Sequence, residues 1–458
     1  MKPDAMQRIA PYTSLVSKLL FPLHESIKKH NSVALRKEME ISQWWSAKQI
    51  EELQKKRLHQ LLVHAQNHVP YYRSLFAEHH IKVENIQSVA DLAQLPLLDK
   101  EKVRANMEAL KSDIAKDLVL FSTGGSTGEP LRFYIGKERV SHDVAAKWRA
   151  TRWWGVDIGD PEIVIWGSPI ELGAQDRVRA QRDRVLRTKL LPAFEMSGPK
   201  LSSLLGEIRA RRPKMLFGYP SVLDHIARHA EARRLRMDDL GIRVAFVTSE
   251  CLSKEQRQQI TKTFGCQVAN GYGGRDAGFI AHECSEGGMH ISAEDIIVEV
   301  VDTQGRRLPP GEAGAIVVTH LATSDFPFIR YRTGDIGALD TEPCGCGRGL
   351  PLIKEIQGRN TDFLVTQDGT AMHSAALVYL LRDLPQVRAF KIIQENLSLT
   401  RILIVSEGGL APDIARKIEF GCRARLGQKV NIAIEEVAEI PPEKSGKFRS
   451  AVSKIAPV

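Results

Sequence analysis

The sequence predicts an α/β fold: a large N-terminal domain with mixed or parallel sheets flanked by helices, followed by a small α+β domain. Between residues 118 and 358, short apolar runs alternate with helical stretches, which indicates a parallel sheet. From Asp295 the pattern changes to strands joined by short turns. After residue 358 a tail combines three strand-like runs with two helical ones. We therefore expect a helical segment at 1–117 packed on a domain at 118–358, and a small domain at 359–458.

Composition sets broad limits on the protein. A chain of 458 residues is too long for one compact core. The net charge of +9 suits anionic ligands, although it also serves solubility. No apolar run approaches the ~20 residues of a membrane span, and the N-terminus lacks the features of a secretory signal. Six cysteines without such a signal favour a reducing compartment, so we expect a cytoplasmic protein.

Three helical stretches are predicted with particular features. Apolar residues at helical spacing predict a helix over Ser46–His68, and Asp99 is a good N-cap for another. The amphipathic stretch Ser14–Lys29 could pack on the body, pair with a second subunit in a homodimer, or touch a membrane. The basic stretch Arg177–Leu190 is predicted as a solvated helix face, with a phosphate or partner contact as the alternative. Only the net charge and this basic stretch favour a nucleic-acid partner. These two features are too weak to predict one, so we expect none.

The predicted strands of the central region end in polar or glycine residues. These runs are Ile163–Gly167, Lys214–Pro220, Val244–Glu250 and Cys266–Gly274. In a parallel sheet, ligands bind at the carboxyl ends of the strands. We therefore expect a ligand site along this edge.

The stretch Phe121–Tyr134, FSTGGSTGEPLRFY, predicts a strand, a glycine-rich loop and a second strand. Glycines let backbone N–H groups approach a phosphate closely, and four hydroxyl side chains add donors. It is not a Walker A loop, because Glu129 stands where a lysine would be needed. A plain surface loop is the alternative interpretation.

Five motifs follow one another along the chain: FSTGGSTGEP, NGYGGRD, FPFIRYRTGDIG, IQGRNTDF and PPEKSGKFR. In this order they resemble the adenylate-forming enzymes, the acyl/aryl-CoA synthetase superfamily. Their spelling is similar to the phenylacetate–CoA ligase branch and its CapK-like or coenzyme F390 synthetase-like relatives. The resemblance covers roughly residues 61–450. It implies a large adenylation domain and a mobile C-terminal lid. It also implies ATP-dependent conversion of a small aryl or acyl carboxylic acid to acyl-AMP, then transfer to CoA or an acyl-carrier protein.

The resemblance implies an ATP site drawn from several motifs. It comprises Ser122, Thr123, Gly124, Gly125, Ser126, Thr127, Gly128, Ser249, Glu250, Tyr272, Gly273, Asp335 and Arg359. Tyr272 would pack on adenine, or be a core aromatic. Asp335 would bind the ribose, or only shape a turn. Lys100 is our candidate for the lysine that the loop lacks. Arg275 could meet a phosphate.

The resemblance also implies catalytic and hinge residues. Asp276 would hold Mg²⁺, although the family usually has the longer Glu there. Arg359 and Lys447 would act on the reacting phosphate. The hinge would lie at Thr361 and Asp362. The acyl pocket would be lined by residues that could equally be core: Trp166, Phe217, Tyr219 and Ser221.

A separate pattern indicates a metal site. Cys284 and His290 are spaced Cys-x₅-His, and Cys344 and Cys346 follow as Cys-x-Cys. Three thiolates and one imidazole suit a structural zinc ion. His282 is a competing ligand, and unlinked thiols are the alternative. CapK-like relatives carry similar cysteines, which favours zinc.

Two alternative functions remain open. A protein like coenzyme F390 synthetase would transfer AMP to a cofactor hydroxyl. A catalytically degenerate member would bind a nucleotide or acyl group without reaction, in keeping with Asp276 and Glu129.

Overall fold

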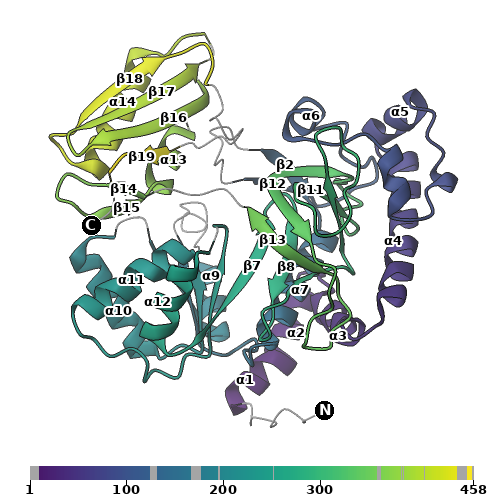
Figure 1. The fold of residues 1–458 in the computed structure, drawn as a ribbon, viewed down its shortest axis with the longest axis horizontal. Coiled ribbons are helices and arrows are strands. Elements are labelled where there is room, and N and C mark those ends of the chain that lie inside the picture. The colour runs from purple at the N-terminus through teal and green to yellow at the C-terminus, as the bar shows by residue number, and fades with distance from the viewer. Residues whose placement is uncertain are drawn as a thin grey trace.

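A computed structural model describes residues 10–123, 131–166, 177–193, 196–250, 252–357, 363–382, 384, 386–406, 408–440 and 451–455. Within these residues the predicted α/β class is confirmed. A large mixed sheet has eleven strands in the order β10-β11-β12-β13-β9-β8-β7-β6-β5-β3-β4. A separate sheet of four strands follows near the C-terminus (Figure 1).

The N-terminal segment is helical, as predicted. Its elements are α1 (Pro11–Leu15), the π-helical turn η1 (Val16–Leu20), α2 (Phe21–Ile27), α3 (Ser32–Ser42), α4 (Ala47–His68), α5 (Pro70–Glu78), η2 (Val83–Asn85), η3 (Ala90–Gln94) and α6 (Lys100–Ala105). The Ser46 side chain accepts from the Gln49 backbone in a capping box, which explains why α4 begins there. The Asp99 carboxylate accepts from the Lys102 N–H at 2.8 Å and caps α6.

The first half of the large sheet is parallel. Its strands are β3 (Glu162–Trp166), β4 (Thr188–Pro192), β5 (Met215–Gly218), β6 (Val244–Thr248) and β7 (Gln267–Gly274). Its flanking helices are α7 (Lys137–Arg152), α9 (Arg177–Leu186), α10 (Gly198–Arg211), α11 (Pro220–Ala232) and α12 (Lys254–Phe264). Alternate residues of β3 face opposite sides: Ile163 and Ile165 join one core, whereas Val164 packs against another. Both faces of this half are therefore buried.

The basic stretch departs from our expectation at its end. The helix α9 stops at Leu186, and Thr188–Leu190 belong to β4. There Lys189 pairs with Ile163 of β3 in a parallel register. Pairing at the sheet edge therefore overrides the local charge pattern, which had suggested a continuous helix.

The second half of the sheet is antiparallel. Its strands are β8 (Gly278–Glu283), β9 (Met289–Ile291), β10 (Ile296–Val301), β11 (Gly314–His320), β12 (Tyr331–Leu339) and β13 (Leu352–Gln357). The strands β1 (Val119–Ser122) and β2 (Arg132–Ile135) form a separate antiparallel pair on either side of the glycine-rich loop. Residues of α4, α5 and these strands share one large core.

The C-terminal elements form a unit with its own core. They are β14 (Phe363–Val365), β15 (Ala371–His373), α13 (Ala375–Arg382), β16 (Val387–Asn396), β17 (Leu399–Ser406), α14 (Pro412–Leu426), β18 (Asn431–Glu436) and β19 (Ala451–Ser453). Phe390, Ile402 and Ile418 are fully buried within it. Figure 1 shows this unit, in yellow and yellow-green, set apart from the large sheet.

A buried ion pair fixes the start of β12. The Arg330 guanidinium donates to both oxygens of Glu299, at 3.1 and 3.0 Å, and to the backbone carbonyls of Leu95 and Gly305. Only 2% of the Arg330 side chain and 1% of the Glu299 side chain are exposed. This pair joins β10, β12 and the N-terminal segment at one point.

We expect Arg330→Ala to lower the free energy of unfolding by about 3–5 kcal/mol, because Glu299 would stay buried without its partner. Urea denaturation measures this. The matched control is Arg306→Ala, which removes the exposed pair with Asp302 and should cost less than about 1 kcal/mol. Equal losses for the two variants would contradict this account.

Candidate active site and metal cluster

The candidate active site lies where the carboxyl end of β7 meets β12. Tyr331, Thr333 and Asp335 lie on β12, where the register with β11 shifts between Arg332 and Ile336. The Tyr272 hydroxyl of β7 lies 3.0 Å from the Asp335 carboxylate and 3.3 Å from the Thr333 hydroxyl. Burial, followed by the charge of Asp335, raises the pKa of Tyr272 well above its usual value. The hydroxyl therefore stays protonated at neutral pH and donates to Asp335.

Asp276 lies in the turn that follows β7. The Tyr331 hydroxyl donates to its carboxylate at 2.6 Å, and 9% of Asp276 is exposed. The other carboxylate oxygen accepts from the Ala277 N–H at 3.2 Å. A carboxylate held by these donors is oriented before any ligand arrives, which suits a metal site.

The base of the glycine-rich loop contacts the same turn. The Arg275 guanidinium donates to the Ser122 carbonyl at 3.2 Å. Arg139 of α7 donates to the backbone carbonyls of Arg275 and Asp276, at 2.9 and 3.2 Å. The Thr123 hydroxyl accepts from the Leu131 N–H and so closes the base of the loop. Arg139 thus supports the turn, and the Arg275 side chain joins the turn to the base of the loop.

Gly273 is required by the close approach of two strands. A Cβ at this position would lie 2.3 Å from the Gly278 carbonyl oxygen. Only glycine fits there, so the NGYGG sequence lets β8 turn back tightly on β7.

Ser249 and Glu250 follow β6 at the same edge of the sheet. Ser249 has φ +73°, a left-handed conformation that is uncommon for a residue with a side chain. The Glu250 carboxylate accepts from the Ser221 N–H at the start of α11, at 3.2 Å. Such backbone strain gathers at ligand sites.

The predicted acyl-pocket residues form a stacked cluster. The rings of Trp166 and Tyr219 lie 4.4 Å apart, and those of Trp166 and Phe217 lie 5.8 Å apart. Phe217 and Tyr219 are buried in two different cores, and Trp166 packs against both. Among the described residues, the buried Ser221 hydroxyl has no hydrogen-bond partner. The cluster therefore fits both interpretations, a part of the hydrophobic core and the lining of an acyl pocket.

Lys100 is brought near β12 by a backbone contact. Leu98 pairs with Tyr331 in a short parallel bridge, so the start of α6 lies beside the YRTGD strand. Lys100 is half-buried at the first position of α6. Several predicted residues lie outside the described part of the chain: Gly124, Gly125, Ser126, Thr127, Gly128, Arg359, Thr361, Asp362 and Lys447.

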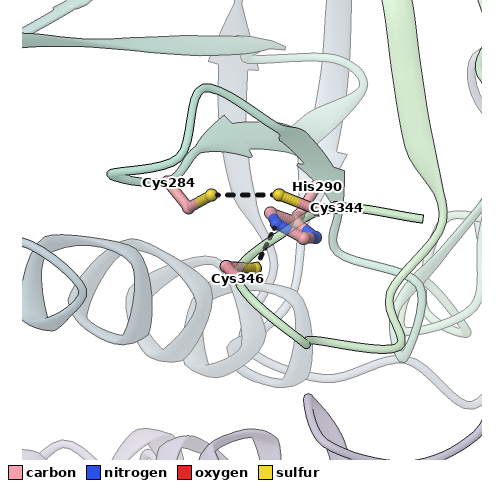
Figure 2. A group of neighbouring side chains, drawn as sticks. All are labelled: Cys284, His290, Cys344 and Cys346. Carbon is pink, nitrogen blue, oxygen red and sulfur yellow. Dashed lines mark hydrogen bonds between the residues drawn. The ribbon is translucent and has the colours of Figure 1, made fainter. Parts of the chain in front are cut away.

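The predicted cysteines and histidine meet in one cluster. The possible ligand atoms of Cys284, His290, Cys344 and Cys346 all lie within 4.8 Å of one another. The Cys284 and Cys344 sulfurs are 3.6 Å apart, and Cys346 Sγ is 3.2 Å from His290 Nε2 (Figure 2). Tetrahedral bonds of 2.3 Å to a metal would place two sulfurs about 3.8 Å apart. The donor set therefore fits zinc.

The competing ligand His282 is not part of this group. Its ring stacks on Phe279 in β8, and burial lowers its pKa to about 3. Gly288, by contrast, makes room for the cluster, because a Cβ there would lie 2.5 Å from Cys344 Sγ.

The cluster is tied to the N-terminal segment through Arg348. Its guanidinium lies 4.9 Å from the Trp44 ring and 4.6 Å from the Trp153 ring, and donates to the Gln43 side chain at 3.2 Å. The Gly349 N–H donates to the Gln43 carbonyl at 3.0 Å. The loop that carries Cys344 and Cys346 is thereby fixed against the end of α3.

Sequence reasoning did not foresee Tyr331, Arg139 or Arg348 as supporting residues. Tyr331 could have been found, because it stands two and four residues before Thr333 and Asp335 in the same motif. Arg139 and Arg348 act on backbone and side chains that are distant in sequence, so no local pattern marks them.

Two family models match this chain. Residues 191–323 match the AMP-binding enzyme model, and residues 364–454 match the CapK C-terminal domain model. The chain is 25% identical to protein CapK of Staphylococcus aureus over 408 residues, which is 88% of this chain and 89% of CapK. It is 26% identical to the phenylacetate-coenzyme A ligase of Thermus thermophilus over 347 residues, 73% of this chain and 76% of that protein.

A solved structure shares the fold. The crystal structure of 2-hydroxyisobutyryl-CoA ligase in the postadenylation state, in complex with R3-HIB-AMP, matches with a TM-score of 0.60 and 21% identity. The match covers 90% of each chain. Together with the family models and the relatives, it confirms the resemblance to the adenylate-forming superfamily.

We expect Tyr272→Phe to lower the free energy of unfolding by about 1–3 kcal/mol, because Asp335 and Thr333 lose a partly buried donor. Urea denaturation measures this loss. Tyr134→Phe is the control: its hydroxyl donates to the exposed Glu108 at 3.3 Å, and its removal should cost about 0.5 kcal/mol or less. A loss for Tyr272→Phe no larger than for the control would show that the contact contributes little.

Proposed function

This chain is a relative of CapK and of the phenylacetate-coenzyme A ligases, and from this premise we propose that it activates a carboxylic acid with ATP. The products of the first step are an acyl-adenylate and pyrophosphate. The observation that carries the proposal is the junction of β7 and β12. There Tyr272, Asp276 and Asp335 come together beside the base of a glycine-rich loop.

Each part of this junction suits one part of ATP. Asp335 would accept from the ribose hydroxyls, replacing its contact with Tyr272. Donors of the loop, beginning with Ser122 and Thr123, would bind the β- and γ-phosphates. Lys100 would supply the positive charge that the loop lacks. The strained step at Ser249 and Glu250 would line the adenine pocket.

Asp276 would hold Mg²⁺, with its carboxylate oriented by Tyr331. The bound ion would offset the negative charge of the phosphates. In the first step an oxygen of the substrate carboxylate forms a bond to the α-phosphorus of ATP, and the bond to pyrophosphate breaks. Lys447 and Arg359 would stabilise the charge that develops on the phosphate oxygens.

The second step would transfer the acyl group from AMP to a thiol. We propose CoA or the phosphopantetheine of a carrier protein as the acceptor, with rotation of residues 359–458 about Thr361 and Asp362 between the two steps. The stacked rings of Trp166, Phe217 and Tyr219 favour an aryl or other apolar acid.

We also propose that Cys284, His290, Cys344 and Cys346 hold a structural zinc ion. The fit of the four ligand atoms supports this. Four protein ligands would leave no open position for substrate, so the ion would brace the loops and take no part in the chemistry. Three reduced thiols in one cluster suit a reducing compartment, so we propose a cytoplasmic enzyme.

We expect acid-dependent exchange of labelled pyrophosphate into ATP, measured over a panel of aryl, fatty and amino acids. Asp335→Asn should raise the KM for ATP about tenfold or more, because it weakens charge-assisted bonds to the ribose, and should leave the KM for the acid unchanged. Glu312→Gln, which changes an exposed carboxylate, is the control and should alter neither value.

Two results would contradict the proposed reaction. ATP binding without exchange for any acid would indicate a degenerate binding protein. Transfer of AMP to a hydroxyl compound without any carboxylic acid would indicate the alternative resembling coenzyme F390 synthetase.

For the metal, we expect about one zinc per chain in protein purified without chelator. Cys344→Ser should remove the ion and lower the thermal midpoint, because the loop between β12 and β13 loses its brace. Cys422→Ala, at a buried thiol of α14, is the control and should retain the zinc. Less than about 0.2 zinc per wild-type chain would overturn the metal proposal.

A further inference from the structure

A row of apolar side chains is exposed along the first helical stretch, α1–η1–α2. Leu15, Leu19, Leu23 and Ile27 have exposed fractions of 45%, 58%, 57% and 74%. The opposite side holds the stretch to the body: Val16 and Phe21 are buried, and Thr13, also buried, donates to Asp160 at 2.8 Å. The exposed row is therefore presented by an anchored helix.

The π-helical turn η1 keeps this row straight. In an α-helix each step of four residues advances about 40° around the axis, so Leu15 and Ile27 would differ by about 120°. One π-turn absorbs an extra residue, which reduces this difference to about 20°. The buried residues Val16 and Phe21 show the same effect, because they are five residues apart on the inner side. The four exposed residues thus lie along one outer face.

The exposed charges on this stretch itself are positive. Lys18, Lys28 and Lys29 are exposed, whereas Glu25, the only acidic residue between positions 10 and 37, is buried. The Glu25 carboxylate accepts from the Ser32 hydroxyl at 2.5 Å. No carboxylate on this stretch therefore faces outward to balance the lysines.

The basic helix α9 extends the same surface. The Tyr12 hydroxyl of α1 donates to the Val185 carbonyl at 2.9 Å, and the Arg187 guanidinium lies 5.4 Å from the Tyr12 ring. Arg184 and Arg187 are both exposed. We call the apolar row, with these two arginines and the three lysines, the N-terminal surface. Figure 1 shows α1 at the margin of the molecule, on the side away from the C-terminal sheet.

We propose that the N-terminal surface docks the protein on an anionic lipid bilayer. An amphipathic helix with leucines on one face and lysines beside them lies in the plane of a membrane, with its apolar face among the acyl chains. Its basic residues bind the anionic headgroups. Among the described residues no helix is long and apolar enough to cross a membrane.

Charge complementarity favours a bilayer over a second copy of this chain. A two-fold interface through this face would bring the same surface of each subunit together. Lysines and arginines would then face one another, with no exposed carboxylate on this stretch to pair with them. An anionic bilayer satisfies both the apolar row and its basic border.

The test is co-sedimentation of the full chain with vesicles of phosphatidylcholine mixed with phosphatidylglycerol, or of phosphatidylcholine alone. We expect binding to the mixed vesicles only. In 1 M salt, where the Debye length is about 3 Å, binding should weaken. Leu19→Gln/Leu23→Gln should lower partitioning about tenfold or more, through loss of buried apolar area. Lys18→Gln/Lys28→Gln/Lys29→Gln should do the same through loss of charge.

Phe420→Gln is the matched control, because Phe420 of α14 is 76% exposed and lies outside the N-terminal surface. It should bind vesicles as the wild type does. All the substituted side chains are exposed, and unchanged thermal midpoints will show that the variants are folded. Three results would overturn the proposal: no sedimentation of the wild type with mixed vesicles, equal binding by all variants, or a wild-type dimer that Leu19→Gln/Leu23→Gln converts to monomers without any vesicle binding.

Discussion

The site depends on a curl in the large sheet. The strands β7 and β12 are separated in the sheet order by β8, β9 and β13, yet the Tyr272 hydroxyl lies 3.0 Å from Asp335. The Tyr331 hydroxyl similarly reaches Asp276 in the turn after β7. A flat sheet would hold these side chains far apart, because neighbouring strands are about 4.8 Å from each other. Two hydrogen bonds between side chains thus close the antiparallel half over the end of the parallel half.

The cluster of Cys284, His290, Cys344 and Cys346 lies at the seam of this curl. Cys284 follows the end of β8 and His290 lies in β9, whereas Cys344 and Cys346 belong to the loop between β12 and β13. The backbone contact between β13 and β9 is short: two residue pairs and the bond from the Ile291 N–H to the Pro351 carbonyl. A metal ion bound by ligands from both sides would hold the two hairpins together. Arg348 connects the same loop to α3. The N-terminal helices thereby help to hold the loop that carries Cys344 and Cys346.

Much of the fold could be predicted because its signals are local. The Ser46 and Asp99 caps and the polar or glycine ends of β3, β5, β6 and β7 are visible within short windows. The change to antiparallel strands was predicted at Asp295, but it begins earlier, at β8. The β4 strand was missed, because it follows an arginine-rich helix directly and its pairing with β3 is not a local property. The roles of Arg139 and Arg348 depend on the curl of the sheet, which likewise is not a local property of the sequence. The grouping of Cys284, His290, Cys344 and Cys346 could be predicted without it, since thiols and imidazoles at short spacings carry their own chemical signal.

The composition of the two main cores bears on how the chain folds as it is synthesised. The core on one side of the parallel strands draws its buried residues from positions 163 to 268, which are nearly continuous in sequence. The core beneath α4 and α5 needs residues from Ile50 to Ile353. The parallel half of the large sheet can therefore begin to pack while the chain is still being synthesised. The N-terminal helices are made first, but their core is complete only after some three hundred further residues have been synthesised.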